Sequence, residues 1–335
     1  MIRNTIGGNF SSQDLLPFMV EDPKNGSSTY FPEVIDHSVK CYFETGADAL
    51  TAIVEEIEEE NKNILLWFPE HYCQETIERI KLKSGIEKTG RYVSLSEAAF
   101  RKDVLNVVVL VHFNRYSPAM QVHSAQKHLI FVEDFVQAPL DIRSTKTAYA
   151  FNSLRKIMGL EIAITYKKRS HTISDETSLY YRLKKEAEAL KTTYQQKKNH
   201  ASEIEFLNLF KKAEQQLVSS KLQAAYSEEV SELQKIDFSA ILSKRRENYA
   251  VLKKALRDQT AISFIEGDYF FFMIQCKNRD QLREALFANN IFAPVHWIDA
   301  PTELSSKILS LPIDQRYNIA DMERTAGIIN QFYSA

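Results

Sequence analysis

The sequence predicts an α/β fold: a large domain with a mostly parallel sheet flanked by helices, followed by a small C-terminal α+β domain. Short apolar runs alternate with helical segments between residues 45 and 167, which is the pattern of parallel strands joined by helical crossovers. Beyond residue 240 the chain again offers both strand and helix segments. The 335 residues are enough for both domains, and 44% of them are hydrophobic, as in globular proteins.

The clearest single element is a helix that begins near residue 46. Apolar side chains between residues 50 and 57 recur at i, i+3, i+4 and i+7, which places them on one face. Thr45 and Asp48 have the spacing of a capping box at its start. Further helices are expected at 74–81, 117–127, 237–256, 279–289 and 320–332, with one or two long ones over 174–219. Strands are expected at 64–68, 106–112, 129–133, 147–151, 160–166 and 269–275.

These elements predict how the chain divides. Residues 1–240 are expected to form the large domain, which includes the N-terminal segment and the helical stretch 174–219. Residues 241–335 are expected to form the small domain, so that the boundary lies inside or just before the helix over 237–256.

Composition and motif content argue against several classes of protein. The formal net charge of −2 lacks the positive field of a nucleic-acid binder, and the basic runs are interleaved with acidic residues. No apolar run is long enough to span a membrane as a helix, and the three cysteines form no CxxC pair. The histidines show no metal-binding spacing, and no GxGxxG or P-loop motif is present. We therefore expect a cytoplasmic protein without a metal, a nucleic-acid partner or a membrane span.

Two short motifs carry groups with distinctive chemistry. Glu133 and Asp134 follow an apolar strand, and a carboxylate at the carboxyl end of such a strand can hold a protonated pyridine nitrogen. Lys156 ends a Ser-Leu-Arg-Lys run, where desolvation lowers the pKa of a lysine and frees its amine for imine formation. Ser153 and Arg155 beside it are suitable phosphate ligands.

The helix start at Thr45 and Gly46 is a third motif, because free N–H groups and the helix dipole attract anions there. Each motif also has an ordinary structural explanation: a carboxylate that caps a turn, an exposed basic turn, and a helix cap. Their order along the chain is more informative than any one of them. An anion site, a carboxylate and a lysine follow in sequence, which matches the phosphate, ring nitrogen and aldehyde of one cofactor.

The segments that carry these motifs resemble the DegT-type sugar aminotransferases, which use pyridoxal 5′-phosphate (PLP) and have PLP fold type I. Residues 44–50 resemble the family's Ser-Gly-Thr-Asp-Ala-Leu helix start, and residues 132–138 its Glu-Asp-x-x-Gln-Ala segment. Residues 153–156 match a Ser-Leu-Arg-Lys form of the family's lysine motif. The Ile-Gly-Gly at 6–8 and residues 311–317 resemble the opening and closing segments, so the resemblance covers nearly the whole chain.

The resemblance implies a role for each matching residue. Lys156 would hold PLP as an internal aldimine and shuttle a proton, Asp134 would pair with the pyridinium nitrogen, and Gln137 would approach the phenolic oxygen. The phosphate would lie among Thr45, Gly46, Ala47, Ser153 and Arg155. Tyr72, with His71 as second choice, would lie over the ring, although a half-buried aromatic with no such role is an equal alternative.

Three positions depart from the family pattern. Ala47 stands where the family usually has Thr or Ser, which removes one phosphate hydroxyl. Asn114 stands where a glycine often follows a His-aromatic pair, and residues 158–164 lack the Gly-Gly pair that commonly follows the lysine. The changes at Asn114 and at 158–164, which begin with Met158, put the shape of the substrate pocket in doubt.

The resemblance implies a homodimeric PLP aminotransferase that acts on a nucleotide-linked keto sugar, with glutamate as amino donor, for amino-sugar or surface-polysaccharide synthesis. One rival is a PLP-dependent dehydratase branch, which has histidine in place of the lysine, so Lys156 argues against it. The other rival is a degenerate homologue that serves as a binding or scaffold subunit.

Overall fold

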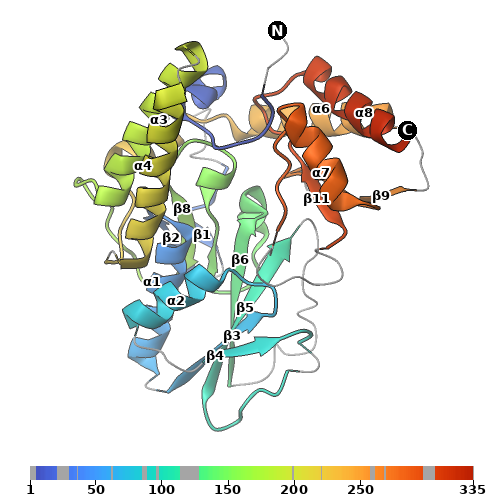
Figure 1. Ribbon diagram of the computed structural model, residues 1–335. Helices are drawn as coiled ribbons and strands as arrows, with labels where there is room; N and C mark the ends of the chain where they lie inside the picture. Colours follow the sequence, from blue (N-terminus) through green and yellow to red (C-terminus); the bar gives the residue numbers. More distant parts are fainter. Residues whose placement is uncertain are drawn as a thin grey trace.

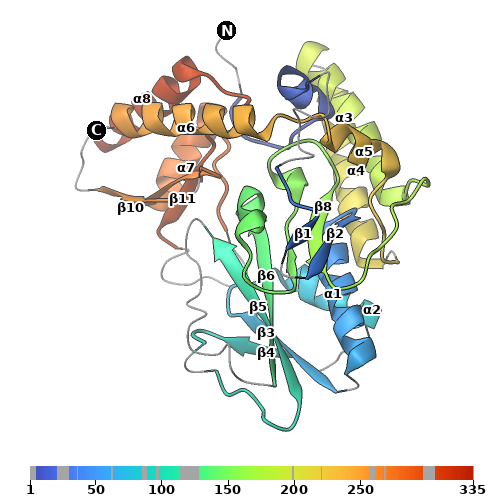
Figure 2. The same cartoon turned by 180° about the vertical axis from the view of Figure 1, so that it is seen from behind.

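The computed structural model describes residues 5–20, 30–35, 37–61, 63–84, 89–95, 98–113, 128–197, 200–219, 221–256, 261–267, 269–296 and 306–334. An eight-stranded sheet occupies the centre, a pair of long helices stands on one side of it, and a smaller part with a three-stranded sheet lies on the other (Figure 1). The same three parts are seen from behind in Figure 2.

The large sheet has the strand order β1-β2-β8-β7-β6-β5-β3-β4. Its middle is parallel, because β4, β3, β5, β6 and β7 all run the same way, whereas β8 and then β2 and β1 add antiparallel pairs at one side. The strands are β1 (Val34–Ile35), β2 (Ser38–Phe43), β3 (Ile64–Pro69), β4 (Thr89–Tyr92), β5 (Leu105–Phe113), β6 (Leu129–Gln137), β7 (Ala150–Phe151) and β8 (Ala163–Lys167).

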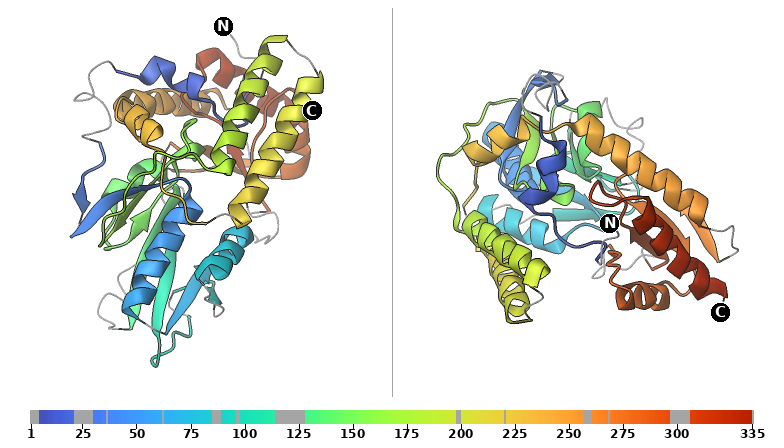
Figure 3. Two further views of the ribbon diagram at one scale, coloured as in Figure 1. Left: turned by 90° about the vertical axis from the view of Figure 1, so that its left-hand side faces the viewer. Right: turned by 90° about the horizontal axis from the view of Figure 1, so that it is seen from above.

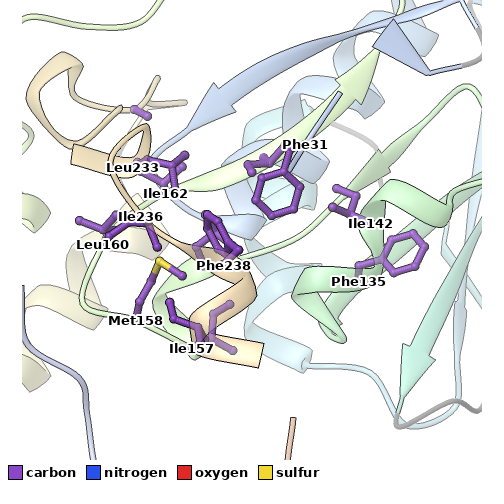
Figure 4. Packing of buried hydrophobic residues seen from close by; sticks show 14 of the residues in the cluster. Phe31, Phe135, Ile142, Ile157, Met158, Leu160, Ile162, Leu233, Ile236 and Phe238 are labelled. Carbon is purple, nitrogen blue, oxygen red and sulfur yellow. The ribbon is translucent and has the colours of Figure 1, made fainter. Parts of the chain in front are cut away.

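Two apolar cores lie on opposite faces of this sheet. On one face α1 (Gly46–Glu60) and α2 (Gln74–Ser84) pack their apolar stripes against β3, β5 and β8, with the α1 residues Leu50, Ile53 and Ile57 fully buried. On the other face the loop after Lys156 packs against α5 (Ser227–Leu233) and the start of α6 (Phe238–Ala255) (Figure 4). Met158 is fully buried in this second core.

The long helices are α3 (Leu179–Lys197) and α4 (His200–Ser219), an antiparallel pair in which α4 contacts α2. The smaller part contains α6, the antiparallel strands β9 (Ile262–Ile265), β10 (Phe272–Cys276) and β11 (Ile308–Leu311), and the helices α7 (Arg279–Ala288) and α8 (Ile319–Ser334). Seen from above, the helix pair and the smaller part lie apart, and the N-terminal segment runs between them (Figure 3).

The N-terminal segment ties the two parts together. Ile6 forms a parallel bridge with Ile291 of the smaller part, and the N–H of Gly7 donates to the Tyr317 hydroxyl at 2.6 Å. After the 3₁₀ helix η1 (Ser12–Phe18), Met19 bridges to Ile236 just before α6.

The expected fold class is confirmed: a mostly parallel α/β sheet flanked by helices, and a small α+β part at the C-terminal end. The expected boundary at 240/241 stays a prediction, and it lies near the start of α6. The helix expected at 117–127 lies outside the described residues. Within the described chain, no helix is long and apolar enough to cross a membrane.

Candidate active site

The carboxyl ends of the parallel strands meet at one edge of the sheet, where they border a cavity of about 190 Å³. The first turn of α1, the segment after β3, the end of β6 and the segment after β7 all reach it. All nine expected site residues line this cavity: Thr45, Gly46, Ala47, Tyr72, Asp134, Gln137, Ser153, Arg155 and Lys156. The structure therefore brings the whole expected set together, although their individual roles stay predictions.

Asp134 is buried at the end of β6. Its Oδ1 accepts the Val136 N–H at 2.8 Å, and its Oδ2 accepts the Tyr72 hydroxyl at 2.8 Å. Burial raises the pKa of Asp134 to about 6, against the opposing effect of these two hydrogen bonds. The carboxyl is therefore mostly ionised at neutral pH, as a partner for a protonated ring nitrogen must be.

Lys156 ends a short 3₁₀ turn, η6 (Leu154–Lys156), directly after β7. Its side chain is accessible from the cavity, yet the protein around it lowers the pKa of the amine to about 8. Burial is the larger cause and the neighbouring Arg155 charge the second. A substantial share of neutral amine is thus present near neutral pH, which a lysine in water lacks.

The start of α1 forms a third side of the cavity. Thr45 is the N-cap, and its hydroxyl accepts the Asp48 N–H at 3.2 Å. The N–H groups of Gly46 and Ala47 belong to the first turn, where the helix itself provides no acceptor. A Cβ on Gly46 would lie 3.1 Å from Val136 Cγ2 and 3.4 Å from Ser153 Cβ, so glycine lets the helix start approach Ser153 closely.

Arg79 on α2 is a site residue that the motifs did not reveal. Its guanidinium lines the same cavity, is 2% exposed, and forms an ion pair with Asp48 at 2.5 Å. Its Nε has no hydrogen-bond partner among the described residues. Arg79 thereby neutralises the carboxylate of Asp48 in the first turn of α1, which would otherwise repel an anion bound there.

Arg155 was expected to bind the phosphate, but its guanidinium is hydrogen-bonded to other side chains. Its guanidinium donates to the Tyr180 hydroxyl at 2.8 Å and to Glu214 Oε1 on α4 at 2.9 Å. Glu214 also lines the cavity, so a phosphate would compete with this carboxylate for Arg155. The contact spans 59 residues and two polar helices, and no local pattern in the sequence signals it.

The two adjacent carboxylates of the strand-end motif have different surroundings. Glu133 contacts His112 Nε2 at 2.9 Å and accepts the N–H groups of Lys146 and Thr147. Burial raises the pKa of Glu133, but hydrogen bonds from His112, Thr145 and Lys146 outweigh burial and leave it below its usual value. Glu133 therefore has a structural role, the ordinary explanation for that position, whereas Asp134 lines the cavity.

His296 of the smaller part lies close to the site, and no motif pointed to it. Its Nε2 lies 3.0 Å from Ser310 Oγ, and its ring lies 5.3 Å from that of Phe113 at the end of β5. Burial, together with the Lys156 charge, lowers its pKa to about 4, so this imidazole is neutral at physiological pH. The influence of the Lys156 charge on this imidazole shows that the smaller part packs near the lysine, although His296 does not line the cavity.

Solved structures with this fold are known. PseC from Helicobacter pylori, an aminotransferase involved in the biosynthesis of pseudoaminic acid, is 12% identical, with 100% of both chains covered and a TM-score of 0.60. The sugar aminotransferase CalS13 from Micromonospora echinospora is 12% identical, with 99% of this chain and 100% of that chain covered and a TM-score of 0.58. The fold is that of the sugar aminotransferases.

DesI, solved in the presence of its TDP-sugar product, has the sugar-aminotransferase fold too. It is 13% identical, covers 88% of this chain and 80% of its own, and has a TM-score of 0.59. No protein-family model and no curated protein matches the sequence. The likeness therefore confirms PLP fold type I as the architecture, while the activity has to be argued from the residues of the cavity.

Proposed function

We propose that the chain is a PLP-dependent aminotransferase that transfers an amino group to a nucleotide-linked keto sugar. The observation that carries this proposal is that Lys156 and Asp134 line the same cavity, an amine and a carboxylate whose pKa values burial shifts in opposite senses. Such paired shifts are typical of groups that exchange protons with a ligand.

The residues of the cavity fit PLP at three points. The first turn of α1 and Ser153 provide donors for a phosphate, with Arg79 balancing the charge of Asp48. Asp134, ionised at neutral pH, would hold the ring nitrogen in its protonated form. Lys156 would hold the aldehyde end, and Gln137, which lines the same cavity, would contact the ring oxygen.

Bound PLP would supply an electron sink for the carbanion that forms when an amino acid loses its Cα proton. Lys156 would be the general base that accepts this proton and the general acid that returns it to the cofactor side. A pKa of about 8 suits both tasks, because the amine and the ammonium form are both populated near neutral pH. Tyr72 would keep the Asp134 carboxylate in place through its hydroxyl.

The finer parts of the proposal rest on the family resemblance. Glutamate as donor, a homodimer that completes each site, and a role in amino-sugar or surface-polysaccharide synthesis all follow from it. A nucleotide-linked acceptor is also in keeping with DesI, whose structure was solved with its TDP-sugar product.

Spectroscopy and product analysis test the proposal. Purified protein mixed with PLP should develop the absorbance of a lysine-bound cofactor, and glutamate should convert it to the amine form with release of 2-oxoglutarate. Nucleotide-linked keto sugars should then restore the original absorbance. A protein that binds PLP without reacting with any amino acid would contradict the transaminase.

The second candidate is a scaffold subunit, and one observation favours it. Arg155 is already bonded to Glu214 and Tyr180, and Ala47 offers no hydroxyl, so two expected phosphate contacts are weakened. Failure to take up PLP at any concentration, by a folded protein, would support this alternative.

A further inference from the structure

The contacts expected for the phosphate of the cofactor are incomplete around the start of α1. Ala47 has no hydroxyl, and the Arg155 guanidinium is hydrogen-bonded to Tyr180 and Glu214. The expected set is thereby reduced to the N-cap and first turn of α1 and the Ser153 hydroxyl. Phosphate oxygens accept several strong hydrogen bonds, so further donors are needed beside them.

The start of α2 borders the same cavity as the start of α1. Thr76 and Arg79 are three residues apart on α2, so they lie on one face of this helix, and both line the cavity. The Ile77 N–H donates to the Cys73 carbonyl, so the N–H groups of residues 74–76 come before the first hydrogen bond of the helix. Like α1, α2 therefore begins at this cavity with the positive end of its dipole.

Arg79 has unused donors at this place. Its side chain is 2% exposed, and its Nη1 lies 3.5 Å from the hydroxyl of Thr45, the N-cap of α1. Among the described residues its close acceptor is Asp48, which Nη2 contacts, and Nε has no acceptor. A guanidinium has five N–H donors. Burying such groups without acceptors costs free energy, and an anion beside the α1 start would supply the acceptors.

We propose that Arg79 and Thr76 of α2 hold the phosphate of the cofactor, together with the first turn of α1 and Ser153. The inference rests on the proposed function for the presence of PLP, and it adds ligands on a helix that none of the sequence motifs includes. Arg79 supplies charge-assisted hydrogen bonds, and Thr76 the hydroxyl that position 47 lacks. Glu75 also lines the cavity, but it is exposed, so water and salt screen its opposing charge.

Comparing the affinity for PLP with that for pyridoxal, which lacks the phosphate, separates contacts to the phosphate from contacts to the ring. In absorbance titrations of the full chain, Arg79→Gln should weaken PLP binding about tenfold or more, and Thr76→Val about threefold. Both variants should bind pyridoxal like the unaltered protein. Thr193→Val on α3, whose hydroxyl donates to the Ala189 carbonyl away from the cavity, is the matched control and should bind both ligands normally.

A double variant distinguishes a phosphate ligand from a residue that only neutralises Asp48. If neutralisation were the whole role, adding Asp48→Asn to Arg79→Gln would restore PLP affinity, because no uncompensated carboxylate would remain in the first turn of α1. We expect the double variant to bind PLP at least about fivefold more weakly than Asp48→Asn alone. Full restoration overturns the proposal, and so does an equal loss of PLP and pyridoxal affinity in Arg79→Gln.

The outcomes separate this inference from the proposed function. Normal PLP affinity in both α2 variants of a protein that reacts with glutamate overturns the phosphate site and leaves the aminotransferase in place. Selective loss of PLP affinity in a protein that reacts with no amino acid supports the site and contradicts the transaminase. If Arg79→Gln does not fold, Thr76→Val decides, and unchanged PLP affinity there overturns the site. A protein that binds neither PLP nor pyridoxal overturns both.

Discussion

At the scale of single residues, the chemistry of Lys156 depends on its place and not only on its pKa. Lys191 on α3 also has a pKa lowered to about 8, by burial and by the Arg316 charge. Lys191 does not line the cavity that contains Lys156, and its Nζ donates to the Asn9 carbonyl. The chain therefore contains two amines of similar basicity, only one of which borders the expected cofactor site.

These two lysines provide a matched pair for a test. With PLP and borohydride, the unaltered protein should acquire one stable cofactor adduct, located by peptide mass spectrometry at Lys156. Lys156→Ala should lose this adduct and keep its circular dichroism spectrum, while Lys191→Ala should keep the adduct. Labelling of Lys191 in the unaltered protein would show that amine basicity alone directs the reaction.

The Tyr72 hydroxyl gives a pH-dependent prediction. Its hydrogen bond favours the ionised form of Asp134, so Tyr72→Phe should raise the pKa of that carboxyl above about 6. Because PLP binding needs the carboxylate, affinity should fall as pH drops through about 6 in the unaltered protein and at a higher pH in the variant. At pH 7 the variant should bind PLP about tenfold more weakly.

A fluorescence titration of PLP from pH 5 to 8 measures this shift. Tyr92→Phe is the control, because its hydroxyl donates to the Val109 carbonyl and the residue does not line the cavity. Identical pH profiles for Tyr72→Phe and the unaltered protein would mean that Tyr72 acts only through its ring, as the family resemblance implies.

At the scale of elements, the start of α1 combines an N-cap, a close approach and an ion pair to α2. Gly46→Ala should destabilise the protein by about 1–3 kcal/mol, because Val136 and the Asn152 carbonyl already lie within 3.3 Å of the added methyl group. PLP affinity should fall with it. Gly327→Ala on α8, where nothing lies within 4 Å of an added Cβ, should stabilise by about 0.5–1 kcal/mol.

Urea denaturation of the two glycine variants gives both values under the same conditions. Binding of PLP is compared with binding of pyridoxal, which lacks the phosphate. A loss of affinity for PLP alone would show that Gly46→Ala disturbs the anion site. Equal weakening of both ligands would mean that the substitution disturbs the cavity as a whole.

Elements with a regular local pattern were predictable from the sequence. The helix from residue 46 and the strands near residues 64, 106 and 129 all occur, and Thr45 and Asp237 are N-caps. The strand expected at 147–151 is reduced to Ala150–Phe151, because the N–H of Thr147 bonds to the buried Glu133 carboxylate and not to a neighbouring strand. Strands β1, β2, β4, β9 and β11 were not predicted. For β2, β4 and β11 the pairing partners are distant in sequence, whereas β1 and β9 pair with the next strand along the chain but are short.

Some residues of the candidate site were likewise predictable from the sequence, and others were not. Residues carried by continuous motifs, such as Asp134 and Lys156, were found from the sequence and line one cavity. Arg79 and Glu214 were missed, since each reaches the site by packing one distant element against another. The partner of a charged residue on a helix depends on how the helices pack, so the local sequence does not predict it.

At the scale of the whole molecule, Gln315 joins the smaller part to the lysine turn. Its amide donates to the Ile157 carbonyl at 2.6 Å, directly after Lys156, and accepts from Arg245 Nε at 2.9 Å. Arg245 is buried on α6 and also donates to the Phe270 carbonyl at 3.0 Å. The position of Lys156 therefore depends on how the smaller part is docked.

Gln315→Leu should break both contacts and leave two buried polar groups without these partners. We expect a loss of about 2–4 kcal/mol in unfolding free energy and slower PLP capture by Lys156. Urea denaturation and stopped-flow absorbance measure the two effects. Gln234→Leu, at an exposed position after α5, should stay within about 0.5 kcal/mol. Unchanged capture in a destabilised Gln315 variant would show that docking does not position the lysine.

The bridge between Ile6 and Ile291 has a consequence for biosynthesis. Residues 5–10 leave the ribosome long before their hydrogen-bond partners, which extend to the Tyr317 hydroxyl. Until then residues 5–10 lack their docking partners, and the cavity that Gly7 to Phe10 line together with the smaller part is incomplete. Docking of this segment is thus coupled to the synthesis of residue 317, and polypeptides arrested before Tyr317 should leave residues 5–10 open to proteases.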